Sequence, residues 1–294
     1  MSLRIGTRGS ALALAQTNKV VGMLVDRGIE AEVVTIATEG DTATGVPLHA
    51  IGGQGVFVRA LDDAILRGEI DAAVHSMKDI PAARPAGLAC CAVLERDSPA
   101  DFLAHEAPLD AVRVVGSSST RRRAQLLRDE PTLEVKQLRG NVDTRIRKLR
   151  EEQYDAVVLA EAGLQRLGLR LAGEPLPTDR FVPSPNQGTV AVVCRDDPVV
   201  AAPFAALDHA PTRLDVEIER AVMEEVGGGC FTPQGIYCRS GNLIAEVLAL
   251  DGSRWERIER HVATIDEARE CGRALRRQAA DLIREAYTAL GVKP

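Results

Sequence analysis

The sequence predicts an α/β fold with two α/β lobes, followed by a small α+β domain at the C-terminal end. Up to about residue 194, short apolar runs alternate with amphipathic stretches, which is the pattern of βαβ units and largely parallel sheets. The residues from 209 onward carry a strand–helix pattern of their own. A chain of 294 residues is long enough for two to three domains of about 100–150 residues, each with a buried core.

The first lobe is expected to contain short strands and longer amphipathic helices, which differ in length and period. The predicted strands cover residues 3–6, 31–37, 72–75 and 87–94, and the predicted helices cover residues 11–27 and 56–67. Between them, residues 38–55 are rich in glycine, threonine and small residues and show no clear period. This segment exceeds the usual connection length, so a mobile lid over a ligand cleft is one hypothesis and plain disorder is the alternative.

The second lobe repeats the same rhythm. Its predicted strands cover residues 113–115, 133–138 and 156–159, and its predicted helices cover residues 120–128, 142–151 and 162–167. Residues 173–185 contain four prolines, which favours a surface connection or hinge over the interior of an element.

After this connection the chain is expected to add a strand at residues 189–194 and then to form the third domain. That domain has a predicted helix at residues 213–226, a strand at 243–250 and one long helix at 265–290. The predicted domains are residues 1–95 with 190–208, residues 96–189, and residues 209–294. A cleft between the strand carboxyl ends of the two lobes is the expected ligand site.

The composition excludes several classes of protein. Apolar residues make up 45% and charged residues 27%, which is the balance of a soluble globular protein. No apolar run approaches the roughly 20 residues that cross a bilayer, so no membrane partner is expected. Arg4 and Arg8 lie where a signal peptide would need its apolar core, so no signal peptide is predicted and a cytoplasmic location is expected. Six cysteines without a CxxC or CxxH pair predict neither a disulfide framework nor a metal site.

The charge is concentrated in one segment, which we call the basic segment. Residues 113–150 hold eleven Lys and Arg against four acidic residues, a net charge of +7, so the rest of the chain carries −13. A basic segment in an acidic protein indicates an anionic ligand, although any one of these arginines can instead solvate a helix face. Nine aromatic residues leave little surface for stacking bases, so no nucleic acid partner is expected.

Five segments place polar residues where strands or helices should end. They are residues 6–10 (GTRGS), 75–81 (HSMKDIP), 116–125 (GSSSTRRRAQ), 139–145 (RGNVDTR) and 227–230 (GGGC). Hydroxyls and arginines at helix N-termini suit carboxylates or phosphates. Within them, His75 is expected to be a satisfied core histidine, and Lys78 and Asp79 are either a surface pair or a clamp beside a catalytic carboxylate. Cys230 is either a small buried hydrophobe or an exposed thiol approached by a bulky group.

Taken together and in this order, the segments resemble the porphobilinogen deaminase (hydroxymethylbilane synthase) family. The resemblance runs from Arg4 to about Gly241 and includes residues 159–168 and 183–188. It implies two periplasmic-binding-protein-like lobes with mixed sheets, a small α+β C-terminal domain with the cysteine, a cytosolic location and a monomer. It also implies a dipyrromethane cofactor, bound through a thioether to Cys230. Four porphobilinogen units would be added in turn, each losing ammonia, before hydrolysis releases hydroxymethylbilane.

The resemblance also implies roles for individual residues. Asp79 would be catalytic, because a carboxylate near pyrrole N–H groups stabilises cationic intermediates and can assist proton transfer. Each pyrrole carries an acetate and a propionate, which basic residues would hold. The residues implied for the cofactor are Cys230, Lys78, Ser119, Arg121 and Arg122. Those implied for the substrate are Arg8, Ser10, Arg139, Arg145 and Arg166.

Some positions depart from the family pattern. Gln54 stands where lysine is common and Asn186 where glycine is common. These two differences affect the roles expected for the lid at residues 38–55 and for the hinge.

The alternative function is a non-catalytic two-lobed binding protein for a carboxylate or oxyanion. Such a protein would not need a cysteine on a glycine run.

Overall fold

The computed structural model describes residues 2–37, 56–81 and 84–291. By its internal contacts the chain divides into two compact units. The first unit is Met1–Asp97 with Gly188–Arg213, and the second unit is Ser98–Gln187 with Leu214–Pro294. The described chain forms one sheet in the first unit and two in the second. The three domain ranges expected from the sequence stay a prediction.

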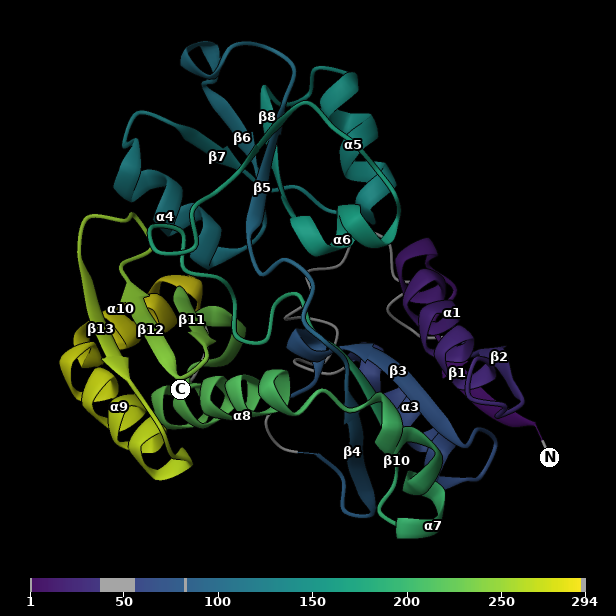
Figure 1. Ribbon diagram of the computed structural model, residues 1–294. Helices are drawn as coiled ribbons and strands as arrows, with labels where there is room; N and C mark the ends of the chain where they lie inside the picture. The colour runs from purple at the N-terminus through teal and green to yellow at the C-terminus, as the bar shows by residue number, and fades with distance from the viewer. Residues whose placement is uncertain (1, 38–55, 82–83, 292–294) are drawn as a thin grey trace. The chain divides into compact units, whose positions relative to one another are not determined.

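The first unit is built on a five-stranded mixed sheet. Its strands are β1 (Leu3–Thr7), β2 (Ala31–Thr35), β3 (Ala72–Ser76), β4 (Leu88–Val93) and β10 (Val190–Arg195). Their order is β2-β1-β3-β10-β4 (Figure 1). β1 is parallel to β2 and β3, whereas β10 is antiparallel to β3 and β4. The carboxyl ends of β1 and β3 therefore lie at one edge of the sheet.

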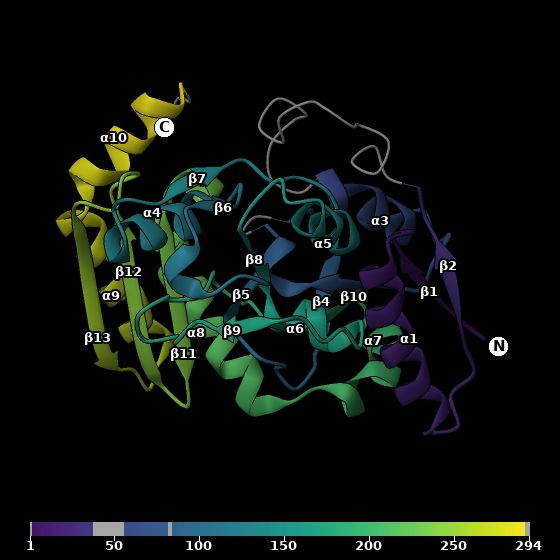
Figure 2. The ribbon, with the colours of Figure 1, turned by 90° about the horizontal axis from the view of Figure 1, so that it is seen from above.

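Helices α1 (Ala11–Val25) and α3 (Val56–Leu66) cover opposite faces of this sheet (Figure 2). Ile5 of β1 packs in one core cluster with Val20 of α1. A Cβ on the next residue, Gly6, would lie 3.2 Å from Leu61 of α3 and 2.2 Å from Ile70. Because successive strand residues point to opposite faces, β1 is packed on both sides, and a side chain at position 6 would have to displace the end of the Ile70 side chain.

The second unit begins with another five-stranded mixed sheet. Its strands are β5 (Asp101–His105), β6 (Val114–Gly116), β7 (Glu134–Lys136), β8 (Ala156–Ala160) and β9 (Gly173–Pro175). Their order is β7-β6-β8-β5-β9, with β6 parallel to β7 and β8, and β5 antiparallel to β8 and β9. The predicted α/β class with mixed sheets is thus confirmed in both lobes.

Helices from the described part of this unit cover the sheet, as can be followed in Figure 1 and Figure 2. They are α4 (Thr120–Asp129), α5 (Val142–Arg150) and α6 (Glu161–Arg166). Leu126 of α4 shares a core cluster with Val158 of β8, whereas Ile146 of α5 shares another with Val157. Neighbouring residues of β8 therefore face different helices, which explains why this strand is apolar along its whole length.

The C-terminal part of the second unit is a three-stranded antiparallel sheet packed against helices. It contains α8 (Ala210–Val226), β11 (Gln234–Arg239), β12 (Asn242–Leu248), β13 (Trp255–His261), α9 (Ile265–Gln278) and α10 (Ala280–Leu290). Its core cluster joins Val222 of α8, Leu243 of β12 and Leu275 of α9. This arrangement confirms the predicted small α+β domain.

Several predicted elements need correction. Residues 173–175 are not only a connection, because they form the edge strand β9. The single long helix expected at 265–290 is wrong, since the backbone leaves helical geometry at Ala279 and separates α9 from α10. Strands β5, β11 and β13 were not predicted at all.

No helix in the described ranges is both long and apolar enough to cross a membrane.

Candidate functional site

The first unit gathers predicted site residues at the carboxyl edge of its parallel strands. Arg8 and Ser10 follow β1, and Lys78 and Asp79 follow β3. Because β1 and β3 pair in parallel, both segments leave the sheet at the same edge. Arg8 and Ser10 are half-buried, whereas Lys78 and Asp79 are exposed.

Local hydrogen bonds hold these two segments in place. Ser10 is the N-cap of α1, and its hydroxyl accepts a hydrogen bond from the backbone N–H of Ala13. Gln16 of α1 donates from Nε2 to the Ser76 hydroxyl at 2.9 Å, which links the helix to the end of β3. Asp79 ends the 3-10 turn Met77–Asp79 that follows directly. The exposed carboxylate of Asp79 is thus carried on a short, hydrogen-bonded turn.

His75 lies beneath this edge and is only 5% exposed, so the predicted burial is confirmed. The prediction that it is satisfied is wrong, because its Nε2 has no hydrogen-bond partner among the residues the structure describes. Burial, followed by the charges of Arg84 and Arg8, lowers the pKa of His75 to about 3. The imidazole is therefore neutral at pH 7. Arg84 also pairs with the buried carboxylate of Asp62, whose pKa is raised by burial.

The second unit gathers the other predicted arginines at the carboxyl edge of β6, β7 and β8. Arg121 and Arg122 follow β6, Arg139 and Arg145 follow β7, and Arg166 follows β8. The three strands are parallel, so their carboxyl ends share one edge. Arg139, Arg145 and Arg166 are half-buried there, whereas Arg121 and Arg122 are buried.

The serine loop, residues 117–119, organises the start of α4. The Ser118 hydroxyl donates to the backbone carbonyl of Leu138 at 2.7 Å and so joins the loops that follow β6 and β7. Ser119 is the N-cap of α4, and its hydroxyl accepts from the backbone N–H of Arg122 at 3.4 Å. Ser119 therefore has a capping role in this structure, and its predicted contact with the cofactor stays a prediction.

Arg121 and Arg122 both pair with Asp101, a fully buried carboxylate at the start of β5. Arg121 Nη1 lies 2.8 Å from Asp101 Oδ2, and Arg122 Nη2 lies 2.7 Å from Oδ1. Burial alone would raise the pKa of Asp101, but the charges of the two guanidinium groups outweigh it and hold the pKa well below its usual range. One carboxylate faces two arginines, so the cluster keeps one positive charge.

Arg145 adds a further positive charge beside this cluster. Burial, and then the charge of Arg122, lowers the pKa of Arg145 to about 10. Its Nε donates to the backbone carbonyl of Gly140 at 2.8 Å. The group remains protonated at pH 7, and the repulsion from Arg122 is the kind that a bound anion would relieve.

Cys230 belongs to a turn that requires glycine. The turn Gly229–Phe231 follows Gly228, whose φ of +81° is in the left-handed region. A Cβ at Gly228 would lie 1.8 Å from Thr232 Oγ1 and 2.8 Å from Thr232 Cβ, so a side chain cannot fit without moving this buried threonine. The side chain of Cys230 lies outside the described part of the structure, as do the predicted lid at 38–55 and Gln54.

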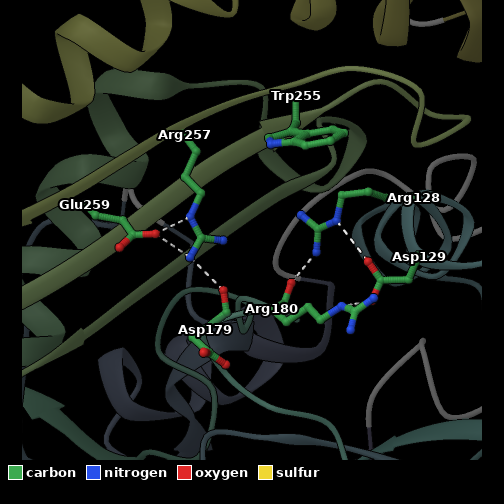
Figure 3. Close-up of a pocket in the computed structure, with 7 residues that line it drawn as sticks. All are labelled: Arg128, Asp129, Asp179, Arg180, Trp255, Arg257 and Glu259. Atoms are coloured by element: carbon green, nitrogen blue, oxygen red, sulfur yellow. Dashed lines mark hydrogen bonds and ion pairs between the residues drawn. The ribbon is translucent and has the colours of Figure 1, made fainter.

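A shallow hollow of about 480 Å³ lies elsewhere in the second unit, between β13 and the end of α4 (Figure 3). We call it the arginine–tryptophan hollow, and its lining residues are Arg128, Asp129, Asp179, Arg180, Trp255, Arg257 and Glu259. The Arg128 guanidinium lies 5.6 Å from the centre of the Trp255 ring. None of the predicted site residues lines this hollow. Within the described ranges, no group of His, Cys, Asp and Glu is placed to hold a metal ion.

Comparison with protein families decides between the two functions expected from the sequence. Residues 3–201 match the family model described as "Porphobilinogen deaminase, dipyromethane cofactor binding domain", and residues 213–281 match "Porphobilinogen deaminase, C-terminal domain". The chain belongs to the porphobilinogen deaminase family. The predicted family and its dipyrromethane cofactor are thus confirmed, and the non-catalytic binding protein is not favoured.

Curated relatives have the same family name, and the similarity covers most of each chain. The chain is 50% identical to a probable porphobilinogen deaminase from Methanosarcina acetivorans, over 92% of this chain and 90% of that protein. It is 44% identical to one from Archaeoglobus fulgidus, over 95% and 99% of the two chains. Among solved structures, a periplasmic substrate-binding protein from Coxiella burnetii has a TM-score of 0.43 and 15% identity, covering 72% of this chain and 94% of that one.

The second unit fits the porphobilinogen deaminase cofactor in its charge. Dipyrromethane derived from substrate carries several carboxylates, and these need cationic partners. Arg121, Arg122 and Arg145 supply three positive charges against the single carboxylate of Asp101. The excess positive charge at this edge is suited to anionic groups.

Sequence reasoning missed the residues that position these arginines. Asp101 lies outside the basic segment and opens a strand that was not predicted. Gln187 also donates to Asp101 Oδ1, at 2.8 Å, from a segment far along the chain. One signal in the sequence could have indicated this role. Asp101 directly precedes the apolar residues Phe102 and Leu103, and a charged residue beside a buried strand is expected to have a charged partner.

Proposed function

We propose that this chain condenses four porphobilinogen units, one at a time and with loss of ammonia, onto a dipyrromethane primer held by Cys230. Hydrolysis would then release hydroxymethylbilane. The main support is membership of the porphobilinogen deaminase family across both matched domains. We further propose that the enzyme acts in the cytoplasm as a monomer. When bound, the dipyrromethane group supplies the carbon atom to which the first substrate unit becomes joined.

Asp79 is the residue to which we assign the chemistry. Loss of ammonia leaves a cation on the substrate, and a carboxylate beside the pyrrole N–H stabilises that cation. The same carboxylate can take up and return a proton at the pyrrole nitrogen. An exposed Asp79 on a short turn at the edge of the first sheet suits a group that contacts substrate rather than other side chains.

Arginines and their neighbours hold the acidic side chains of the pyrroles. Each ring brings one acetate and one propionate, so the negative charge grows as the chain lengthens. We propose that the acidic groups on the cofactor rings are bound by Lys78, Ser119, Arg121 and Arg122. We assign the arriving and growing rings to Arg8, Ser10, Arg139, Arg145 and Arg166. Guanidinium groups suit this task because they bind carboxylates with two parallel hydrogen bonds.

The intact mass of the purified protein tests the covalent attachment. The wild-type chain should exceed its sequence mass by two substrate-derived pyrroles and should colour with acidic Ehrlich's reagent. Cys230→Ser should lose both the mass increment and the colour. Cys271→Ser is the matched control, because Cys271 is buried in the C-terminal core, and this variant should keep the increment. A Cys230→Ser protein that still carries two pyrroles would contradict the proposed attachment.

A further inference from the structure

A chain of buried hydrogen bonds runs from the C-terminal sheet to the arginines of the second lobe. It starts at Glu246 of β12, passes through Gln125 of α4 and reaches Arg121. Arg121 in turn bonds Asp101. Glu246, Gln125 and Asp101 are all fully buried. Buried polar groups of this kind are costly unless each is paired, so their arrangement is tightly specified.

Glu246 is paired on both of its carboxylate oxygens. Oε1 accepts a hydrogen bond from Gln125 Nε2 at 2.8 Å. Oε2 accepts from Arg128 Nη1 at 3.0 Å and from Arg257 Nη1 at 3.1 Å. Both arginines line the arginine–tryptophan hollow (Figure 3). The carboxylate therefore has two separable contacts: one toward the hollow, and one toward Gln125.

The contact with Gln125 determines how the Gln125 amide is oriented. An ionised carboxylate can only accept, so Gln125 must turn its NH₂ group toward Glu246. The same NH₂ group donates to the carbonyl of Val182 at 2.9 Å. Oε1 of Gln125 is then left facing Arg121 Nη1, at 2.9 Å. If the amide rotated by half a turn, it would set a donor against the guanidinium group.

Arg121 is held by one end only. Its Nη1 lies within hydrogen-bond distance of three acceptors, namely Asp101, Gln125 and Val182. No described residue accepts a hydrogen bond from its Nε or Nη2. The three acceptors around Nη1 therefore fix the direction in which the guanidinium plane points.

We propose that Glu246 is a positioning residue that acts through Gln125 to orient Arg121 for the carboxylates of the cofactor. This inference rests on the proposed function, because Arg121 is assigned there to the dipyrromethane group. It connects the C-terminal domain, which carries Cys230, to the arginines of the second lobe. Docking of the C-terminal sheet against α4 would thereby complete the binding site for the cofactor.

Three variants separate positioning from stability. Glu246→Met removes both contacts of the carboxylate. Glu246→Gln can still present an oxygen to Gln125 while its amide faces the two arginines. Arg257→Gln weakens only the contact on the side of the hollow. We expect all three to lower the melting temperature, but only Glu246→Met to lower kcat/KM per loaded chain, by about tenfold or more, since a misplacement of about 1 Å can cost about a hundredfold.

The second readout is the fraction of purified holoenzyme that carries the two-pyrrole mass increment. This fraction should fall in Glu246→Met and stay near the wild-type value in Glu246→Gln and Arg257→Gln. If loading and kcat/KM instead follow the melting temperature across all three variants, Glu246 is only structural and the inference is wrong.

Gln125→Met keeps the test available if Glu246→Met does not fold, because it breaks the same chain one bond later. Gln125→Met should reproduce the loss of kcat/KM and of loading, and adding Glu246→Met should cause no further loss in a double-mutant cycle. Additive losses would contradict a shared path. A wild-type protein without the mass increment would contradict the proposed function itself, whereas normal loading in wild type, Glu246→Met and Gln125→Met would contradict only the positioning role.

Discussion

Asp79 and His75 stand at the two ends of one short segment, yet their surroundings give them opposite properties. His75 is buried in the first sheet and its imidazole is neutral at pH 7. Asp79 lies on the exposed turn that follows. Burial thus separates a structural residue from the proposed catalytic one, although both are polar and both belong to the same motif.

Replacing Asp79 by asparagine should lower kcat by about a hundredfold or more, because preorganised charge at a developing cation is commonly the largest catalytic contribution. The side chain is exposed, so the melting temperature and the far-UV circular dichroism should stay near those of wild type. Asp63→Asn, at an exposed position of α3, is the matched control and should keep full activity. Wild-type turnover in Asp79→Asn would remove Asp79 from the mechanism.

His75 should make the stability of the protein depend on pH. Its pKa is lowered to about 3 in the folded chain, first by burial and then by Arg84 and Arg8, against about 6.5 when unfolded. Between these values the unfolded chain binds a proton that the folded chain does not. The free energy of unfolding therefore falls as the pH falls below about 6.5, by about 1.4 kcal/mol per pH unit, or about 2 kcal/mol between pH 6.5 and pH 5.

Chemical unfolding at pH 6.5 and pH 5, followed by circular dichroism, measures this dependence. His75→Asn should remove that part of the difference between the two pH values, whereas His261→Asn, at an exposed position of β13, should leave it unchanged. An equal pH dependence in wild type and His75→Asn would show that folding does not lower the pKa of His75.

At the level of elements, the sequence predicted the helices and strands whose buried faces are apolar along their whole length. Strand β8 and helix α5 were found to within a residue or so, because their buried faces are filled with aliphatic residues. Strand β13 was missed since it pairs on one side only and its sequence, WERIERH, is mostly charged and exposed. The break at Ala279 was missed because the amphipathic pattern continues through it, with neither glycine nor proline to mark it.

The segment before β10 contains a residue in a glycine-like conformation. Asn186 has a φ of +63° and is buried, and its backbone N–H donates to Glu219. Asparagine is among the residue types that best tolerate a left-handed backbone, which suits it to this position.

Asn186→Gly should therefore be more stable than Asn186→Ala, by about 1–2 kcal/mol in the free energy of unfolding. Both substitutions remove the same side-chain amide, so their difference reports the cost of a Cβ at positive φ, less the greater backbone entropy that glycine loses on folding. Urea unfolding of the two variants under identical conditions measures that difference. Equal midpoints would mean that the backbone does not keep the left-handed conformation at this position.

At the level of the whole molecule, the contacts that join the second lobe to the C-terminal domain were beyond sequence reasoning. The charge of the basic segment predicted an anionic ligand, and the resemblance to the family implied which of its arginines would hold carboxylates. Their buried partners were not predicted, because Gln125 and Glu246 are separated by 121 positions and Arg122 and Asp101 by 21. Single polar residues in separate elements carry no common period, so only folding brings them together.

Glu219 of α8 is a second buried carboxylate that joins distant parts of this unit. It is fully buried, and its oxygens accept backbone hydrogen bonds from Asn186 at 2.6 Å and from Cys238 of β11 at 2.8 Å. It therefore holds both the segment before β10 and the C-terminal sheet against one helix. An amide has a single acceptor oxygen, so glutamine at this position would leave one backbone N–H facing a donor.

Glu219→Gln should thus lower the free energy of unfolding of the second unit by about 1–3 kcal/mol, the cost of a buried polar group left unpaired. Trp255 is the only tryptophan of the chain and lies on β13, so its fluorescence reports this unit selectively. In urea, the Trp255 transition of Glu219→Gln should move to lower concentration. Glu224→Gln, an exposed position on the same helix, should leave the transition in place. A shift as large in Glu224→Gln would point to the charge of α8, rather than to the two buried hydrogen bonds, as the source of the stability.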